Sequence, residues 1–242
     1  HISVHLCQVV IQQPANFKDA TSARFDGGEP FQTLMAAAEK VFMTIPPPQP
    51  SGGRPPQAMA RFMHSSGPCV CGSALVQLPG GLRRRADRVR AGDEVAVGGG
   101  VAATVQCVGR TPCVDGAAEL VELGPDLLIT PYHPVRFDEG PYQFPRDVPG
   151  AVRLGQHECE ALYSFLLNGA PELCIAGVKV LAWAHGVQDD AVASHEYFGT
   201  DKVVLDLSHI EGFAGGFVEL HPGWVRRGAD GRVCKIAAPP CV

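Results

Sequence analysis

The sequence lacks both a long apolar run and a strong excess of charge of one sign. No stretch approaches the roughly 18 to 20 apolar residues that a membrane-spanning helix needs, so no membrane span is expected. Its 20 Lys and Arg and 25 Asp and Glu give a formal net charge of −5 at pH 7. Such a balance offers no electrostatic attraction to nucleic acid or to an anionic membrane surface. The arginines at 83–85 form a short basic run of the kind that usually lies on a solvated face, so no nucleic acid is expected as a partner.

Disulfide and metal-binding patterns are also lacking. The cysteines are odd in number, and no short spacing repeats among positions 7, 69, 71, 107, 113, 159, 174, 234 and 241. This distribution argues against a disulfide framework, and most of these side chains are expected to be small buried apolar groups. Cys-x-Cys at 69 and 71 is not the Cys-x-x-Cys of a zinc ribbon, so no metal and no other cofactor is predicted. A structural zinc would require His133 and His185 to converge in space with cysteines from elsewhere in the chain.

The first 68 residues differ in composition from the rest. Apolar residues predict a short strand within 1–13 and a helix over 30–43, which we interpret as the end of a preceding domain covering 1–45. Proline and glycine then dominate, and residues 46–68 are predicted to form an exposed, semi-rigid linker. The sequence begins without methionine and without a signal-peptide pattern, so we interpret it as a piece of a longer protein. A cytoplasmic location is favoured over secretion.

From Cys69 onward, short apolar stretches are separated by glycine and proline, with little helical periodicity. Their spacing of about 8 to 15 residues predicts an all-β fold. Turns are expected at 91–93 and at 98–100. After Gly186 the sequence becomes polar, and ordered stretches at 197–198, 203–207 and 217–220 predict a β extension over 187–242. The candidate strands before it are 75–78, 89, 94–97, 101–108, 119–123, 127–130, 152–154, 161–167 and 173–184.

Two stretches carry residues suited to cleavage of the chain by itself. Cys69 opens a candidate strand, and Thr130 and His133 lie together in one later turn. A Cys69 thiolate can attack the carbonyl of Pro68 through a five-membered ring and convert their amide bond into a thioester. Amide resonance resists this step, so the bond must be distorted and a proton must reach the departing nitrogen. An imidazole such as His133 can supply that proton, and a hydroxyl or backbone donor at Thr130 can hold the carbonyl oxygen.

Five blocks of sequence resemble, in order, the Hint domain of hedgehog proteins and inteins. The blocks are Cys69 with Gly72, Val76, Leu78 and Gly81, then Val89-Arg-Ala-Gly-Asp93-Glu-Val, Thr130-Pro-Tyr-His133-Pro-Val, Tyr163-Ser-Phe, and Leu181-Ala-Trp-Ala-His185-Gly186. The resemblance covers about 69–235. The tail, with His195-Glu-Tyr-Phe-Gly-Thr200 and Lys202-Val-Val, is similar more narrowly to Hint domains found downstream of von Willebrand A domains.

The resemblance implies a flat, horseshoe-like all-β disc of two pseudo-symmetric halves over 69–186, with Cys69 at its centre. It implies that Cys69 is the nucleophile and that Thr130 and His133 activate the amide. His185 corresponds to the histidine that precedes the terminal asparagine of inteins. The next residue here is Gly186, which has no side-chain amide to cyclise, so full splicing is not expected. Water, a thiol or another external nucleophile is then expected to resolve the thioester and release the N-terminal segment, which is the substrate.

Three departures from the family pattern bear on the reaction. Hedgehog proteins use an aspartate on an early strand to activate a sterol, but no carboxylate occurs in the comparable stretch 105–110. Cholesterol transfer is therefore not expected. Pro68 stands where glycine is usual and restrains the backbone at the scissile carbonyl. Cys71 offers a second thiol on the same strand face as Cys69.

Other functional classes lead to different expectations for the same residues. A papain-type protease places its cysteine at a helix N-terminus, whereas Cys69 opens a strand. An inactive Hint-like scaffold that serves as a protein-interaction module fits the low charge, the many glycines and Pro68. On that interpretation Cys69 is an inert buried thiol, and His133 and His185 are structural. The segment 195–200 is interpreted as an ordered surface hairpin.

Overall fold

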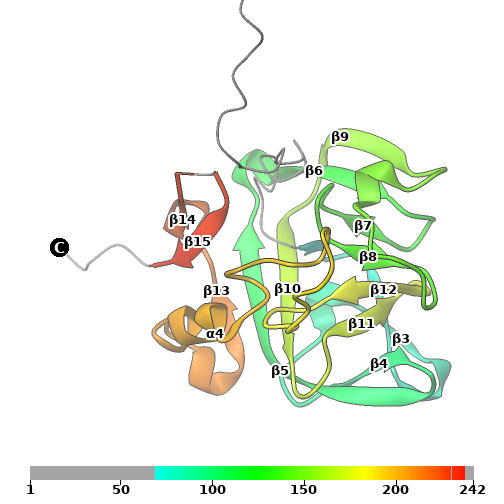
Figure 1. Ribbon diagram of the computed structural model, residues 1–242, viewed down its shortest axis with the longest axis horizontal. Helices are drawn as coiled ribbons and strands as arrows, with labels where there is room; N and C mark the ends of the chain where they lie inside the picture. Colours follow the sequence, from blue (N-terminus) through cyan, green and yellow to red (C-terminus); the bar gives the residue numbers. More distant parts are fainter. Residues whose placement is uncertain (1–68, 230, 238–242) are drawn as a thin grey trace, which may run out of the picture. The chain divides into compact units, whose positions relative to one another are not determined.

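The computed structural model describes residues 69–229 and 231–237, which are drawn in colour in Figure 1. The expected strand within 1–13, the helix over 30–43 and the linker over 46–68 lie outside these residues. Within them, most regular structure is short strands, as the all-β prediction requires. No helix in the described part is long and apolar enough to cross a membrane.

The larger sheet has eight strands in the order β13-β5-β10-β1-β7-β6-β9, with β4 paired to β5. β1 has only two residues, yet it lies in the interior of the sheet, because Val70 pairs with Tyr163 on one side and with Ile129 on the other. Cys69, which precedes it, is therefore held between segments that are distant in sequence. The bounds are β1 Val70–Cys71, β4 Glu94–Gly98, β5 Val101–Pro112, β6 Ala117–Glu122, β7 Leu128–Ile129, β9 Val152–Glu158, β10 Ala161–Leu167 and β13 Phe217–Glu219.

A second sheet of five strands has the order β3-β2-β11-β12-β8. The single long strand expected over 173–184 is in fact the hairpin β11–β12. Ala176 and Gly177 both have positive φ, 50° and 84°, and two such residues turn the chain back on itself. The expected strand residue Val89 lies outside the strands but is fully buried. The bounds are β2 Leu75–Gln77, β3 Arg83–Arg85, β8 Val135–Arg136, β11 Glu172–Ile175 and β12 Val178–Leu181.

β5 shows how the main core and the C-terminal extension share one strand. From Ala103 to Cys107 buried and exposed positions alternate, as in a strand with one face on a core. At Cys107 and Val108 both faces become buried. Val108 packs in the main core, whereas Cys107 packs in a second core formed largely by the extension. The extension is thus anchored to the same strand that pairs with β10 beside the site.

The extension after Gly186 contains a helix as well as strands. The helix α4, Asp201–Ser208, begins at Thr200, whose hydroxyl accepts from the Lys202 N–H, and it buries Val203 and Leu207 on one face. This helix takes the place of the β structure that was expected over 203–207. β13 runs parallel to β5 (Figure 1), and two further strands, β14 Val225–Arg227 and β15 Val233–Ile236, pair with each other.

The segment 195–200 is a buried turn and not a surface hairpin. Tyr197 is 2% exposed and Phe198 5% exposed, so both rings belong to the second core. The Nδ1 atom of His195 accepts from the backbone N–H groups of Tyr197 and Phe198, each at 3.1 Å. The histidine therefore caps the turn that leads into α4, which is a structural role.

Gly109 on β5 leaves room for the side chain of Trp183. A Cβ atom at this position would lie 2.1 Å from Cη2 of Trp183, far inside van der Waals contact. Trp183 is itself buried in the second core. Only glycine, which has no Cβ, lets the indole approach the strand this closely.

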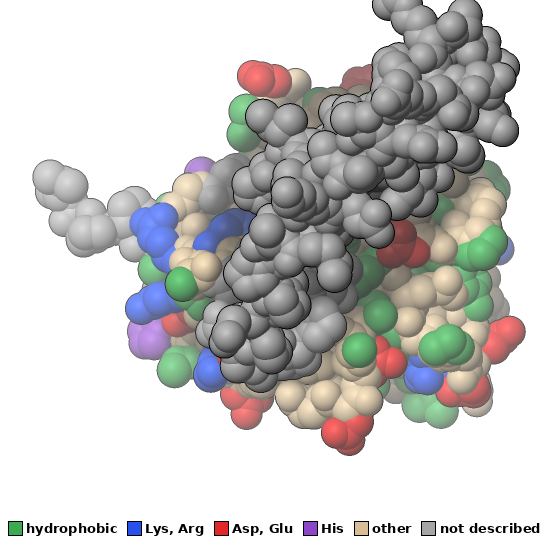
Figure 2. All heavy atoms as spheres, turned by 45° about the horizontal axis from the view of Figure 1, so that its top comes forward, with side chains coloured by type: hydrophobic (Ala, Val, Ile, Leu, Met, Phe, Trp, Pro, Cys, Tyr) green, Lys and Arg blue, Asp and Glu red, His purple; other side chains and the backbone are tan. Residues whose placement is uncertain are grey.

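Charges of both signs are spread over the surface that Figure 2 shows. Most of its visible Lys and Arg side chains lie at the left end, in the region of β14 and β15, where Arg226, Arg227 and Lys235 are exposed. Acidic side chains lie at several separate places around the rim. The face therefore shows no broad basic area among the described residues.

Candidate active site

Cys69 lies at the start of β1 and is 7% exposed. Its carbonyl accepts two hydrogen bonds from Thr130, one from the backbone N–H at 3.0 Å and one from Oγ1 at 3.1 Å. Its own N–H donates to the same Oγ1 at 3.3 Å. The backbone of the predicted nucleophile is thus fixed on both sides of its Cα by one threonine.

Thr130 directly follows β7 and is 2% exposed. Because its hydroxyl accepts from the Cys69 N–H, it touches the nitrogen of the bond expected to break. The sequence predicts that a donor on Thr130 holds the oxygen of the scissile carbonyl. Its backbone N–H and its hydroxyl both donate to the carbonyl of Cys69. The carbonyl of Pro68 lies outside the described residues, so a contact of Thr130 with that oxygen stays a prediction. The structure therefore describes one contact of Thr130 with the scissile bond, the hydrogen bond from the departing nitrogen to its hydroxyl.

His133 is in the turn after Thr130, and its ring is 3% exposed. Nε2 lies 2.7 Å from the carbonyl oxygen of Leu181, so this nitrogen carries the hydrogen and Nδ1 is left as an acceptor. Nδ1 has no hydrogen-bond partner among the described residues. Burial lowers the pKa of His133 to about 4, although the backbones of Leu181 and Cys69 partly oppose this shift. The ring is consequently neutral at physiological pH and can accept a proton at Nδ1.

Ser164 is a further polar side chain at the site, and the sequence analysis did not single it out. Its Oγ lies 3.1 Å from Sγ of Cys69, and it is 4% exposed within the otherwise apolar strand β10. Burial raises the pKa of Cys69 to about 12, and the contact with Ser164 works in the opposite direction. The signal in the sequence was a lone serine in an apolar strand, because a buried hydroxyl needs a partner.

His185 lies near this group without joining it. Its Nδ1 accepts from the Val187 N–H at 3.1 Å, and its ring packs so closely on Gly199 that a Cβ there would lie 2.9 Å from Cε1. Burial lowers the pKa of His185 to about 4. The charge of a protonated His185 also disfavours protonation of His133, so the two rings are electrostatically linked. The described hydrogen bond of His185 holds its own loop, and a catalytic role for it stays a prediction.

A cavity of about 480 Å³ lies beside Cys69. Cys69, Thr130 and Ser164 form part of its wall, so the thiol and the hydroxyls around it face open space. The extension also contributes to the lining, through residues that include Phe198, Leu220 and Ile236. Residues of the extension therefore help to form the space beside the predicted nucleophile.

Metal binding finds no support in the part of the chain that the structure describes. No group of three or more His, Cys, Asp or Glu side chains there is placed to hold a metal ion. His133 is instead bonded to a carbonyl and His185 to a backbone N–H. The convergence that a zinc site would have required is not seen among these residues.

Comparison with known proteins gives a family and several structural likenesses. A family model described as "Vint: Hint-domain" matches residues 68–235, well over half of the chain. The DnaB intein from Synechocystis sp. PCC 6803 has 16% sequence identity and a TM-score of 0.35, with 48% of this chain and 98% of that chain covered. The gp41-1 intein has 13% identity and a TM-score of 0.35, with 48% and 99% covered. No curated protein matches the sequence.

The family match carries the assignment, because the intein likenesses are distant. It spans the sheets, the Cys69 site and nearly all of the described extension. The Hint domain expected from the sequence is confirmed, and so is its all-β fold. A capacity for self-processing in general goes with this domain. The chain belongs to the Hint-domain family.

Proposed function

We propose that the chain cuts its own backbone between Pro68 and Cys69 through an N-to-S acyl shift. One observation carries the proposal: the nucleophile and the nitrogen of the scissile bond are held in a single buried site. Ser164 lies 3.1 Å from the sulfur, and Thr130 Oγ1 lies 3.3 Å from the nitrogen. The N-terminal segment ending at Pro68 is the substrate, and no metal or cofactor takes part.

The proton movements follow from the resting states of the two side chains. Because the pKa of Cys69 is raised, its thiol is protonated and needs a base. His133 is neutral with an open Nδ1, so it takes the thiol proton as sulfur bonds to the Pro68 carbonyl carbon. The same proton then passes to the Cys69 nitrogen as the C–N bond breaks. The products of this step are a Pro68 thioester on Sγ and a free amine on Cys69.

An external nucleophile then resolves the thioester. The cavity beside Cys69 can admit water or a small thiol, which attacks the acyl carbon and releases the Cys69 thiolate. Cleavage of this hedgehog-like kind is proposed in preference to splicing, because Gly186 after His185 offers no amide for cyclisation. Sterol transfer is not proposed, because residues 105–110 contain no carboxylate.

We place the chain, more narrowly, among Hint domains that follow von Willebrand A domains. The motif behind this proposal, 195–200 with 202–204, forms the turn and the start of α4 that carry Phe198 to the cavity wall. The proposed organisation is the tail of a preceding domain over 1–45, a linker over 46–68, the Hint domain over 69–186 and the extension over 187–242.

A second candidate function is an inactive Hint scaffold that serves as a protein-interaction module. The observation in its favour is the raised pKa of Cys69, which leaves almost no thiolate at neutral pH. Pro68 adds to this, since its ring restrains the backbone that must distort.

Intact-mass spectrometry of the purified chain separates the two functions. The chain is incubated near neutral pH with and without dithiothreitol or hydroxylamine, beside a Cys69→Ala control. Thiol-accelerated loss of residues 1–68, with a new fragment that begins at Cys69 and is absent from the control, supports self-cleavage. An unchanged mass over days with either nucleophile overturns it and favours the scaffold.

A further inference from the structure

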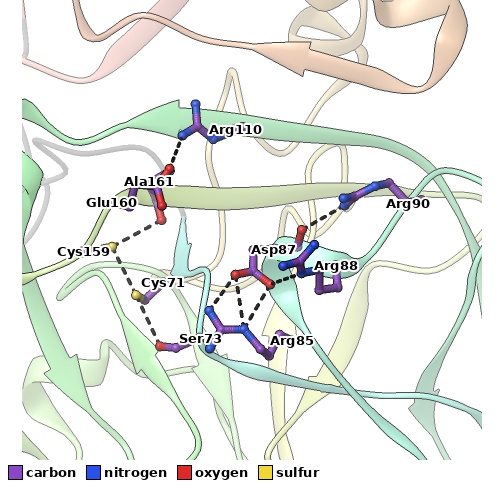
Figure 3. A network of polar contacts seen from close by, with 10 residues as sticks. All are labelled: Cys71, Ser73, Arg85, Asp87, Arg88, Arg90, Arg110, Cys159, Glu160 and Ala161. Atoms are coloured by element: carbon purple, nitrogen blue, oxygen red, sulfur yellow. Dashed lines mark hydrogen bonds and ion pairs between the residues drawn. The ribbon is translucent and has the colours of Figure 1, made fainter.

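A pair of cysteine sulfurs lies next to the site but takes no part in the proposed cleavage. Sγ of Cys71, on β1, is 3.2 Å from Sγ of Cys159, which lies between β9 and β10 (Figure 3). Both residues are buried, and they pack in a small cluster with Leu120. Cys113 packs against this cluster and also lines the cavity beside Cys69.

The two sulfurs share hydrogen-bond donors unequally. The Cys159 thiol donates to Cys71, and the Ser73 hydroxyl donates to the same sulfur at 3.4 Å (Figure 3). These donors lower the pKa of Cys71, while the same contact raises the pKa of Cys159, so the pair holds a proton between a thiolate and a thiol. The positive charge of Arg85 interacts favourably with the Cys71 thiolate. Ser73 is exposed, which places the Cys71 sulfur just beneath the surface.

We propose that Cys71 and Cys159 are a redox-active pair that a hydroperoxide oxidises reversibly to a disulfide. The Cys71 thiolate attacks the peroxide, taking one oxygen as a sulfenic acid while hydroxide leaves. The Cys159 sulfur then attacks the Cys71 sulfur. The sulfenic hydroxyl leaves with the Cys159 proton as water. The pair loses two electrons, which hydrogen peroxide gains; the hydroxide released in the first step takes a proton from solvent, so that two waters form in total.

The geometry favours this pair over the other cysteines of the described chain. The sulfurs lie 3.2 Å apart and must approach by roughly 1.2 Å to reach the bond length of about 2.05 Å. The described hydrogen bond of the Cys69 sulfur is to a hydroxyl and not to a thiol, although Cys113 is near enough to raise its pKa. Cys174 is influenced by Lys179 and Glu172 but by no second cysteine. Cys113 is the competitor, because it also contacts Cys159.

Disulfide mapping in a Cys69→Ala chain tests the pair independently of self-cleavage, which that substitution removes. The reduced chain is treated with hydrogen peroxide, the remaining thiols are alkylated, and the protein is digested with trypsin. The expected product joins peptides 62–83 and 154–179 through Cys71 and Cys159 and is separated again by dithiothreitol. Fragmentation distinguishes Cys159 from Cys174, which share a peptide.

Matched variants complete the test. Adding Cys71→Ser or Cys159→Ser is expected to remove the linked product, whereas adding Cys174→Ser, which also alters a buried cysteine, is expected to retain it. A link from peptide 111–136, which carries Cys113, to Cys159 in place of Cys71 would overturn the assignment. Accumulation of Cys71 as sulfinic acid, without any link to Cys159, would also overturn the assignment.

Discussion

Cys69 and Cys71 are two residues apart, equally exposed at 7%, and opposite in chemical state. Burial dominates at Cys69, and its pKa is raised, because its one hydroxyl neighbour does not offset the loss of solvent. Cys71 receives hydrogen bonds from a thiol and from Ser73, and its pKa is lowered. Thiol acidity in this strand therefore depends on the balance between burial, which dominates at Cys69, and hydrogen-bond donors, which dominate at Cys71.

The comparison also explains why the proposed nucleophile requires a base. Cys71 is the more acidic thiol, but it lies against Cys159 and Leu120, away from the scissile nitrogen. Cys69 lines the cavity with Thr130 and Ser164 and lies at the bond to be cut. Cys69 is the proposed nucleophile because it lies at the scissile bond and not because its thiol is acidic. A neutral His133 must therefore remove its proton.

The largest expected effect is that of removing one thiol or the other. Cys69→Ala is expected to abolish cleavage, because it removes the thiol from the residue whose nitrogen is bonded to the Pro68 carbonyl, whereas Cys71→Ala should stay within about twofold of the wild-type rate. Intact-mass spectrometry over time measures both. If Cys71→Ala alone stopped cleavage, the two cysteines would have to exchange roles.

Removing the proposed base, His133, is expected to have the second-largest effect on the cleavage rate. His133→Ala is expected to slow cleavage by about 10²–10⁴-fold, the usual contribution of a positioned acid or base. The wild-type rate should hold as pH is lowered through 6.5 and fall only near pH 4, where burial has placed the pKa of His133. A fall in rate centred near pH 6.5 would show that the ring is solvated when it acts.

The same buried ring makes stability depend on pH. The unfolded chain protonates His133 near pH 6.5 and the folded chain near pH 4, so stability is fully present above 6.5 and is lost as pH falls to 4. The loss from this ring amounts to at most about 3 to 4 kcal/mol. Urea unfolding of the Cys69→Ala chain at several pH values measures it, with added His133→Gln as control. An equally steep pH dependence in the control would assign the loss to other groups.

Much of the fold could be predicted from local pattern. β10 was expected at its observed bounds, because a short, mainly apolar run between polar ends predicts a buried strand. α4 was missed because Val203 and Val204 are β-branched and favour strands in isolation. The Thr200 cap and the burial of Val203 and Leu207 on one face favour the helix. Because burial depends on the rest of the chain, this local stretch does not predict it.

The site was predictable in part for the same reason. Cys69, Thr130 and His133 were identified because a motif ties their residue types to one reaction, and the structure brings Cys69 and Thr130 into contact. Ser164 and the Cys71–Cys159 pair depend on how β1 and β10 align, across 95 and 88 residues of sequence. No local pattern encodes such a register.

The smallest predicted effect tests whether a hydroxyl can make Cys69 resemble Cys71. Ser164→Ala removes the only hydrogen bond described for the Cys69 sulfur, so the pKa of Cys69 should rise further and cleavage should slow by about tenfold. The alkaline rise in rate should move to higher pH, a change that a purely structural role would not produce. Ser73→Ala is the matched control, since it removes a hydroxyl from the other thiol, and it should leave the rate and its pH profile unchanged. Equal slowing in both variants, with no shift of the profile, would mean that Ser164 supports the strand and not the nucleophile.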